Sequence, residues 1–203
     1  MTGCQADYGD DRHCGNCQSL ASDIPVHEVI IHRQECERPE LVYHQLSAQG
    51  AVAIKFIPHL QPADARLWGD FLCAVFAIWV KEDANRIVVP LFEATLRAWR
   101  GESVQYANNP PGPACAGCAW LRLCGGGCPQ LRLEDGSNAL CEGYRQFYSW
   151  SAPYMRVLRD LLNQHRSPVE LMHLLIRLAG ADPLRPGHAG QSGWLQANTF
   201  FFG

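Results

Sequence analysis

The chain has 203 residues, a formal net charge of −3 at pH 7 and 10 cysteines. Its 17 lysines and arginines are scattered and form no basic stripe, so we expect no nucleic-acid partner. The first residues are polar and acidic, and the longest apolar stretch, near residues 71–80, is too short to span a bilayer. These features predict a cytoplasmic protein without a membrane partner, whose cysteines are ligands or free thiols rather than disulfides.

Residues 1–24 carry three cysteines among Gly, Asp and Asn and lack a periodic apolar pattern, which predicts an irregular lead. Cys14 and Cys17 form a CxxC pair, and Cys4 precedes them. Free thiols on a loose terminus are the favoured interpretation. The alternative is a metal site that Cys128 or His13 completes.

Residues 25–101 are expected to form an α/β unit. Apolar runs at 25–33 and 51–58 predict two strands, and the segment 39–49 between them predicts a helix that begins at a proline. Two strands joined through a helix should be parallel. His59 would then lie at the carboxyl end of a strand, where α/β proteins bind ligands, although a lone loop histidine is more often simply solvated.

Two further helices complete this unit. The apolar stripe of residues 62–83 predicts the clearest helix of the chain, with Cys73 as a core or neutral surface thiol. Residues 87–89 predict a short strand and 90–100 another helix. The prolines of 102–114 then predict a linker.

Five cysteines gather between residues 115 and 141. Their order is Cys115-x-x-Cys118, Cys124, three glycines, Cys128, and finally Cys141. The glycines can adopt positive φ and bring backbone N–H groups close to bound sulfur, so metal or cluster binding is favoured over buried free thiols. A single CxxC knuckle with no histidine among these cysteines favours an iron–sulfur cluster over zinc, which stays the alternative.

Helices are predicted on the C-terminal side of the cysteines. Residues 144–166 should form a helix that is kinked or broken at Pro153, and residues 168–179 a shorter one with His173 on its polar face. The cysteine module is therefore expected to cover residues 115–180. Residues 181–203 are expected to be a loose tail.

The cysteine motif, with Leu140-Cys-Glu-Gly-Tyr144 and Pro153-Tyr-Met155, resembles the C-terminal part of the anaerobic sulfatase-maturating enzymes. These belong to the radical SAM superfamily and carry a SPASM extension. Residues 54–58 and 71–80 resemble the closing part of the family's barrel, and the likeness spans roughly residues 26–178. The resemblance implies that this chain binds one auxiliary 4Fe-4S cluster, whose ligands would be Cys115, Cys118, Cys124 and Cys141. In the family, the cysteine that matches Cys128 is a ligand of a second cluster.

Other parts of the family's machinery are not found in the sequence. The S-adenosylmethionine-cleaving motif CxxxCxxC is absent from these 203 residues. The family's acidic base and the remaining ligands of the second cluster would fall between Arg100 and Cys115, where only a proline linker stands. We therefore expect a truncated homologue that does not use S-adenosylmethionine, has no catalytic residue of its own and does not convert a sulfatase residue to formylglycine alone.

The expected fold class is an α/β fragment, an incomplete radical SAM barrel followed by a mostly helical cysteine module. A complete barrel needs eight strands and about 250 residues, and this chain supplies two or three strands. Two alternatives stay open. One is a zinc-stapled protein-interaction module, and the other is one half of a split enzyme whose partner polypeptide completes the barrel. A sulfatase is the other partner that the resemblance implies.

Overall fold

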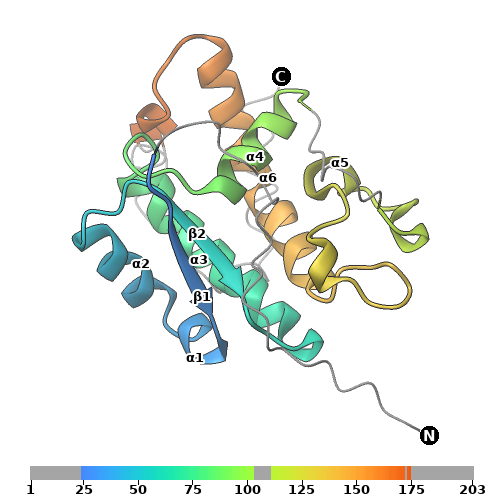
Figure 1. Ribbon diagram of the computed structural model, residues 1–203. Helices are drawn as coiled ribbons and strands as arrows, with labels where there is room; N and C mark the ends of the chain where they lie inside the picture. The colour runs from blue at the N-terminus through green and yellow to red at the C-terminus, as the bar shows by residue number, and fades with distance from the viewer. Residues whose placement is uncertain (1–23, 103–110, 172, 175–203) are drawn as a thin grey trace, which may run out of the picture.

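The computed structural model describes residues 24–102, 111–171, 173 and 174, and these include a parallel pair of strands. Strand β1 (His27–Ile31) pairs with β2 (Ile54–Pro58), with His27 opposite Ile54 and Ile31 opposite Pro58. Helices α1 (Arg33–Cys36) and α2 (Pro39–Ala48) connect the two strands. The predicted strand, helix and second strand are therefore confirmed, and the described part is α/β with a mostly helical remainder (Figure 1).

Helix α1 was not predicted from the sequence. It has four residues, too few to show a helical period. The Glu35 carboxylate accepts the backbone N–H of His32 at 3.0 Å and caps its first turn. A short capped turn of this kind is set by local hydrogen bonds rather than by an apolar stripe.

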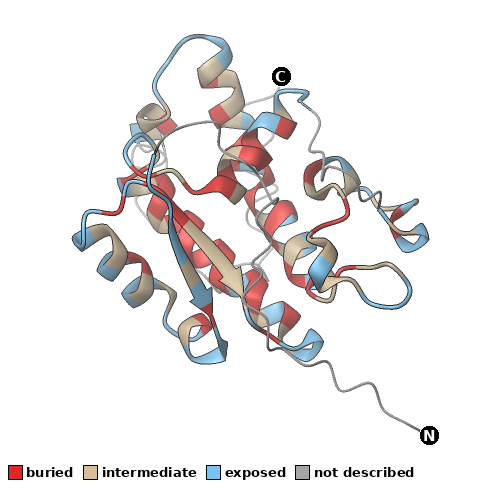
Figure 2. Cartoon of the chain, in the orientation of Figure 1, coloured by how far each residue is buried: buried red, intermediate tan, exposed pale blue. Residues whose placement is uncertain are grey.

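The core lies between the sheet and three longer helices. These are α3 (Ala65–Glu82), which follows the turn η1 (Pro62–Asp64), α4 (Pro90–Trp99) and α6 (Cys141–Asn163). On one side of α3, Phe71 packs edge-on against Phe56 of β2, with ring centroids 5.3 Å apart. On the other side, Phe76 packs against Phe147 of α6 at 5.9 Å. Figure 2 shows buried residues concentrated on α3 and on the neighbouring helices.

Two glycines let α3 and α6 approach closely. A Cβ atom on Gly143 would lie 2.0 Å from the carbonyl oxygen of Ala65, and one on Gly69 would lie 2.9 Å from the Cα of Gly143. No side chain fits in this space. The contact fixes the first turn of α6, which begins at Cys141, against the core.

Two details of the sheet differ from expectation. The apolar run that predicts the first strand indicates a buried strand, but Ile30 is 45% exposed and Ile31 is the one residue of β1 in the buried class. In the described part of the chain the sheet has two strands. The predicted strand at 87–89 is reduced to a single parallel bridge between Ala53 and Val88.

The sequence predicted a kink or a break at Pro153, and the break does not occur. Helix α6 runs without interruption from Cys141 to Asn163 and begins three residues before the predicted start. A proline removes one backbone hydrogen bond. Tyr154, Met155 and Leu158 follow the proline and are buried, and their packing stabilises the second half of the helix.

Several predictions lie partly or wholly outside the described residues. These are the lead at 1–24 with its three cysteines, most of the linker at 102–114, the helix at 168–179 and the tail at 181–203. Among the described helices, none has the length and apolar character to cross a membrane. The division of the chain into domains stays a prediction.

Candidate functional site

The five clustered cysteines lie on short turns and helix ends. Cys115 closes the turn η2 (Pro113–Cys115), and its carbonyl accepts the backbone N–H of Cys118 at 3.0 Å. Cys124 is the last residue of α5 (Leu121–Cys124), and Cys141 is the first of α6. Each cysteine is thus held at the end of a hydrogen-bonded turn, and all five are free thiols.

Four of these thiols are close enough to influence one another electrostatically. Burial raises the pKa of Cys124, the backbone N–H of Gly126 lowers it, and the charges of Cys118, Cys115 and Cys141 raise it further. Burial also raises the pKa of Cys141, against the lowering effect of Arg145, while Cys118 and Cys115 again raise it. Like charges disfavour one another's ionisation when they share a site. The structure therefore places the four cysteines in one neighbourhood.

A single-ion centre is not preformed. Among the described residues, no group of three or more His, Cys, Asp or Glu side chains is arranged to hold one metal ion. The assignment of Cys115, Cys118, Cys124 and Cys141 as ligands stays a prediction.

The three glycines between Cys124 and Cys128 have the predicted backbone conformation. Gly125, Gly126 and Gly127 have φ values of 59°, 88° and 70°. The Gly126 N–H donates to the Cys124 sulfur at 3.3 Å. A Cβ on Gly127 would lie 2.6 Å from the amide nitrogen of Asn138. The loop therefore requires glycine both for its φ angles and for its close packing.

Asn138 gives an independent test of whether a sulfur-rich group fits here. This residue is 6% exposed, its Oδ1 accepts the N–H of Leu140 at 2.8 Å, and its Nδ2 has no hydrogen-bond partner. Leaving a buried donor unpaired costs about 1–3 kcal/mol. The Asn138 amide lies beside the glycine loop that joins Cys124 and Cys128. Its unpaired N–H group could donate to a sulfur atom of a bound cluster, so the site fits such a cluster.

Cys128 occupies a different environment from the other four cysteines. It caps the turn η3 (Pro129–Leu131). Burial raises the pKa of its thiol, while the backbone N–H groups of Gln130 and Leu131 and the charges of Lys55 and Arg132 lower it. Lys55 belongs to β2 and pairs with Glu28 of β1 at 2.8 Å. The pKa of Cys128 is thus affected by cations, whereas that of Cys124 is affected by other thiols.

The other candidates from the sequence are not assembled into a site. Cys73 is buried in α3, and burial raises its pKa to about 12. His59 is exposed after β2 and meets His32 edge-on, with ring centroids 4.8 Å apart. His173 is exposed. Cys4, Cys14 and Cys17 lie outside the described residues.

One residue at the site was missed in the sequence. The charges of Cys141 and Cys118 raise the pKa of Arg145, and hydrogen bonds from its guanidinium to both sulfurs add to this effect. Arg145 follows Cys141 by four residues on α6, a spacing that puts the two on one helix face. That spacing could have identified it.

Comparison with known proteins gives relatives that each match more than half of the chain. No protein-family model matches the sequence. The protein YidF of Escherichia coli (strain K12) is 41% identical over 168 residues, which cover 78% of this chain and 97% of YidF. This identity over nearly all of the relative shows common membership of a family.

A second relative is an enzyme of known class. The serine-type anaerobic sulfatase-maturating enzyme of Bacteroides thetaiotaomicron is 25% identical over 171 residues, which cover 53% of this chain and 41% of the enzyme. The chain therefore matches less than half of the enzyme's length.

Solved structures show the same relationship at the level of the fold. The structure described as native anSMEcpe with bound AdoMet aligns with a TM-score of 0.54 at 16% identity, over 66% of this chain and 57% of that one. The structure with AdoMet and the Cp18Cys peptide aligns equally well, with a TM-score of 0.54. The chain therefore belongs to the same family as E. coli YidF, and it is related to the anaerobic sulfatase-maturating enzymes of the radical SAM superfamily, of which it matches a part.

Proposed function

We propose that this protein is a maturase-related protein that binds one auxiliary 4Fe-4S cluster and does not cleave S-adenosylmethionine by itself. The ligands would be Cys115, Cys118, Cys124 and Cys141. The observation that carries the proposal is that the CxxC turn, the end of α5 and the start of α6 bring these four thiols close enough for the charges of Cys115 and Cys118 to raise the pKa of both Cys124 and Cys141. A bound cluster would supply electron transfer.

Two features of the surrounding residues support a cluster. Bound sulfur requires nearby N–H donors, and this site offers the Gly126 backbone N–H, the Arg145 guanidinium and the unpaired amide of Asn138. Four thiolates on one cluster each bind a different iron, so they need not converge as closely as on a single zinc ion, whose sulfurs lie at about 2.3 Å from the metal.

Anaerobic purification and cluster reconstitution, followed by iron and sulfide assays, test the proposal. The expected result is a coloured protein with about four irons and four sulfides per chain, the composition of a 4Fe-4S cluster. Cys141→Ala should prevent assembly of this cluster. Cys128→Ala, a change in the same module but outside the four ligands, should retain it.

The controls separate the alternatives. Cys73→Ala tests whether loss of any buried thiol lowers the iron content, and it should leave the iron content unchanged. A colourless protein without iron or sulfide after reconstitution would contradict the proposal. Stoichiometric zinc in aerobic preparations, with loss of helix on chelation, would support the zinc-stapled module instead.

A partner polypeptide is a second candidate function, and the sheet favours it. In the described residues β1 pairs with β2 along one edge, and its apolar neighbourhood is exposed, with Ile24 at 40% and Ile30 at 45%. A strand with a free edge is a template for pairing with another chain. Co-expression with a CxxxCxxC-bearing radical SAM chain or with a sulfatase, followed by size-exclusion chromatography, should give a co-eluting complex; two separate peaks would contradict this candidate.

A further inference from the structure

The indole ring of Trp99, the last residue of α4, brings together two arginines from different helices. The guanidinium carbon of Arg122, on α5, lies 5.7 Å from the centre of the ring, and that of Arg156, on α6, lies 5.5 Å from it. Nη1 of Arg122 also donates to the carbonyl oxygen of Ala98 at 2.7 Å. Two positive charges that are distant in the sequence are therefore held at one place in the fold.

These two charges are not neutralised within the described part of the chain. The ion pairs found there involve other arginines, and Arg122 and Arg156 take part in none of them. By contrast Arg159, three residues after Arg156 on α6, pairs with Asp160 at 2.8 Å. Arg122 and Arg156 are both exposed. Like charges held close together repel one another, and an anionic group that met both arginines would offset this repulsion.

The contact with Trp99 prepares the two arginines for binding. An aromatic face attracts a guanidinium without using its N–H groups, which stay available to bind a carboxylate. Holding an arginine against a ring also restricts its side chain in advance, which lowers the entropy cost of binding a partner. Tryptophan and arginine are enriched among the residues that contribute most of the binding energy in protein interfaces. The residues Trp99, Arg122 and Arg156 therefore have the composition of an interface, and we call them the Trp99 cluster.

We propose that the Trp99 cluster is a docking surface for an acidic segment of a partner protein. The two guanidinium carbons are separated by no more than the sum of their distances to the ring centre. Side chains four residues apart on a helix lie about 5–6 Å from each other, so two Asp or Glu residues of one segment can reach both arginines.

A protein is favoured over nucleic acid as the partner. The chain has a net charge of −3, and its basic residues do not form the long stripe that a nucleic-acid backbone requires. The proposal is independent of cluster binding. It involves α4, α5 and α6 and no residue of β1, so it is also distinct from pairing at the edge of the sheet.

Fluorescence anisotropy on the full chain tests the proposal, with labelled octaglutamate as the probe and octaglutamine as the uncharged reference. The wild type should bind octaglutamate and not octaglutamine. Its affinity should fall several-fold as the salt concentration rises from about 20 mM to about 200 mM, because exposed charges are screened. Arg156→Gln removes one of the two charges and should weaken binding by at least about fivefold.

Two further variants support the interpretation. Arg122→Gln should weaken binding in the same way, and it decides the test if Arg156→Gln does not fold. Arg66→Gln is the matched control, since Arg66 is an exposed arginine of α3 that lies 3.6 Å from Glu142 and does not belong to the Trp99 cluster. Its substitution removes the same charge from another part of the surface, and its affinity for octaglutamate should equal that of the wild type.

Three results would overturn the proposal. The first is a wild type that binds octaglutamate no better than octaglutamine. The second is an equal loss of affinity in Arg66→Gln and Arg156→Gln, because the overall charge of the protein would then explain the binding. The third is tighter binding of a double-stranded DNA oligonucleotide than of octaglutamate, with the same sensitivity to Arg156→Gln, which would assign the surface to nucleic acid.

Discussion

The hydroxyl of Tyr43 donates a hydrogen bond of 2.9 Å to Oδ2 of Asp83, and both residues are buried. The bond ties α2 to the residue that ends α3. The second carboxylate oxygen of Asp83 accepts the Nε–H of Arg86 at 2.8 Å. A buried carboxylate is tolerated because both of its oxygens are paired. The helix that crosses between the two strands is thus anchored by a polar contact as well as by apolar packing.

Tyr43→Phe should destabilise the protein. It removes the donor to Asp83 and leaves a buried carboxylate oxygen unpaired, which costs about 1–3 kcal/mol. Urea denaturation measures the loss. The control is Ser47→Ala, which removes the acceptor of a 2.8 Å bond from Arg86 at the surface and should cost about 0.5 kcal/mol or less. Equal effects of the two substitutions would show that burial of Asp83 is not what makes the contact important.

The same contact predicts a dependence on alkaline pH. Burial is the largest cause that raises the pKa of Tyr43, and the hydrogen bond to Asp83 raises it further. A group whose pKa is raised by folding binds more protons in the folded state, so its contribution is complete below the ordinary tyrosine pKa of about 10 and declines as the pH rises above it. The free energy of unfolding should therefore fall more steeply above pH 10 in the wild type than in Tyr43→Phe. Parallel curves would contradict the assignment.

Gly143→Ala should destabilise the protein although alanine is the better helix former. The new Cβ would meet the Ala65 carbonyl oxygen at 2.0 Å, so α6 would have to move away from α3. Overpacking of this kind costs about 1–3 kcal/mol, more than the roughly 1 kcal/mol that alanine gains over glycine within a helix. Thermal unfolding measures the difference. Gly117→Ala is the control, since nothing lies within 4 Å of its Cβ position, and it should have little effect.

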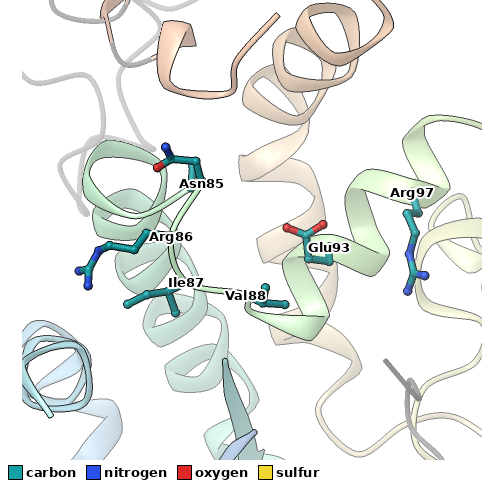
Figure 3. Close-up of a pocket in the computed structure, with 7 residues that line it drawn as sticks. Asn85, Arg86, Ile87, Val88, Glu93 and Arg97 are labelled. Atoms are coloured by element: carbon teal, nitrogen blue, oxygen red, sulfur yellow. The ribbon is translucent and has the colours of Figure 1, made fainter. Parts of the chain in front are cut away.

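Glu93→Gln should stabilise the protein at neutral pH. Glu93 lines a cavity of about 330 Å³ beside residues 84–88. Burial raises the pKa of its carboxyl, and Arg97 lowers it in part. In Figure 3 the Glu93 carboxylate and the Arg97 guanidinium point in different directions from α4, which limits the compensation.

The sign of this effect follows from the raised pKa. The protonated form is favoured by folding, so the stability it contributes is present below the ordinary glutamate pKa of about 4.3 and is lost as the pH rises through the folded value. Glu93→Gln should therefore unfold at higher urea concentration than the wild type at pH 7, and the difference should shrink toward pH 4. Glu40→Gln, an exposed carboxylate in the first turn of α2, is the control and should not stabilise. A stabilisation independent of pH would contradict the explanation.

Trp99→Leu should loosen the segment that carries Cys124. The guanidinium carbons of Arg122 and Arg156 lie 5.7 Å and 5.5 Å from the centre of the Trp99 ring, so this ring links α5 and α6 to the end of α4. Such contacts contribute about 0.5–2 kcal/mol each. Hydrogen exchange should become faster in residues 118–128. Trp99→Phe keeps an aromatic face and should cause a smaller change, and equal rates in wild type and Trp99→Leu would contradict the link.

Local features of this protein are determined by the sequence. The apolar runs around Ile54 and Val29 and the helix between them are short-range patterns, and the structure confirms them as a parallel pair with a helical connection. The glycines after Cys124 likewise have the positive φ angles that their lack of a Cβ permits. The cysteine motif, together with residues 140–144 and 153–155, was sufficient to indicate the relationship to the sulfatase-maturating enzymes.

Features that depend on distant contacts were decided by the tertiary structure. The approach of Gly143 to Ala65, the continuity of α6 through Pro153 and the exposure of Ile30 each result from how whole elements pack, and no local pattern carries that information. The raised pKa of Arg145 is of the same kind, since it depends on the charges of both Cys141 and Cys118. Cys141 lies on the same helix as Arg145, four residues earlier, so the sequence spacing alone places these two together. Cys118 affects Arg145 because the tertiary fold brings the two segments together.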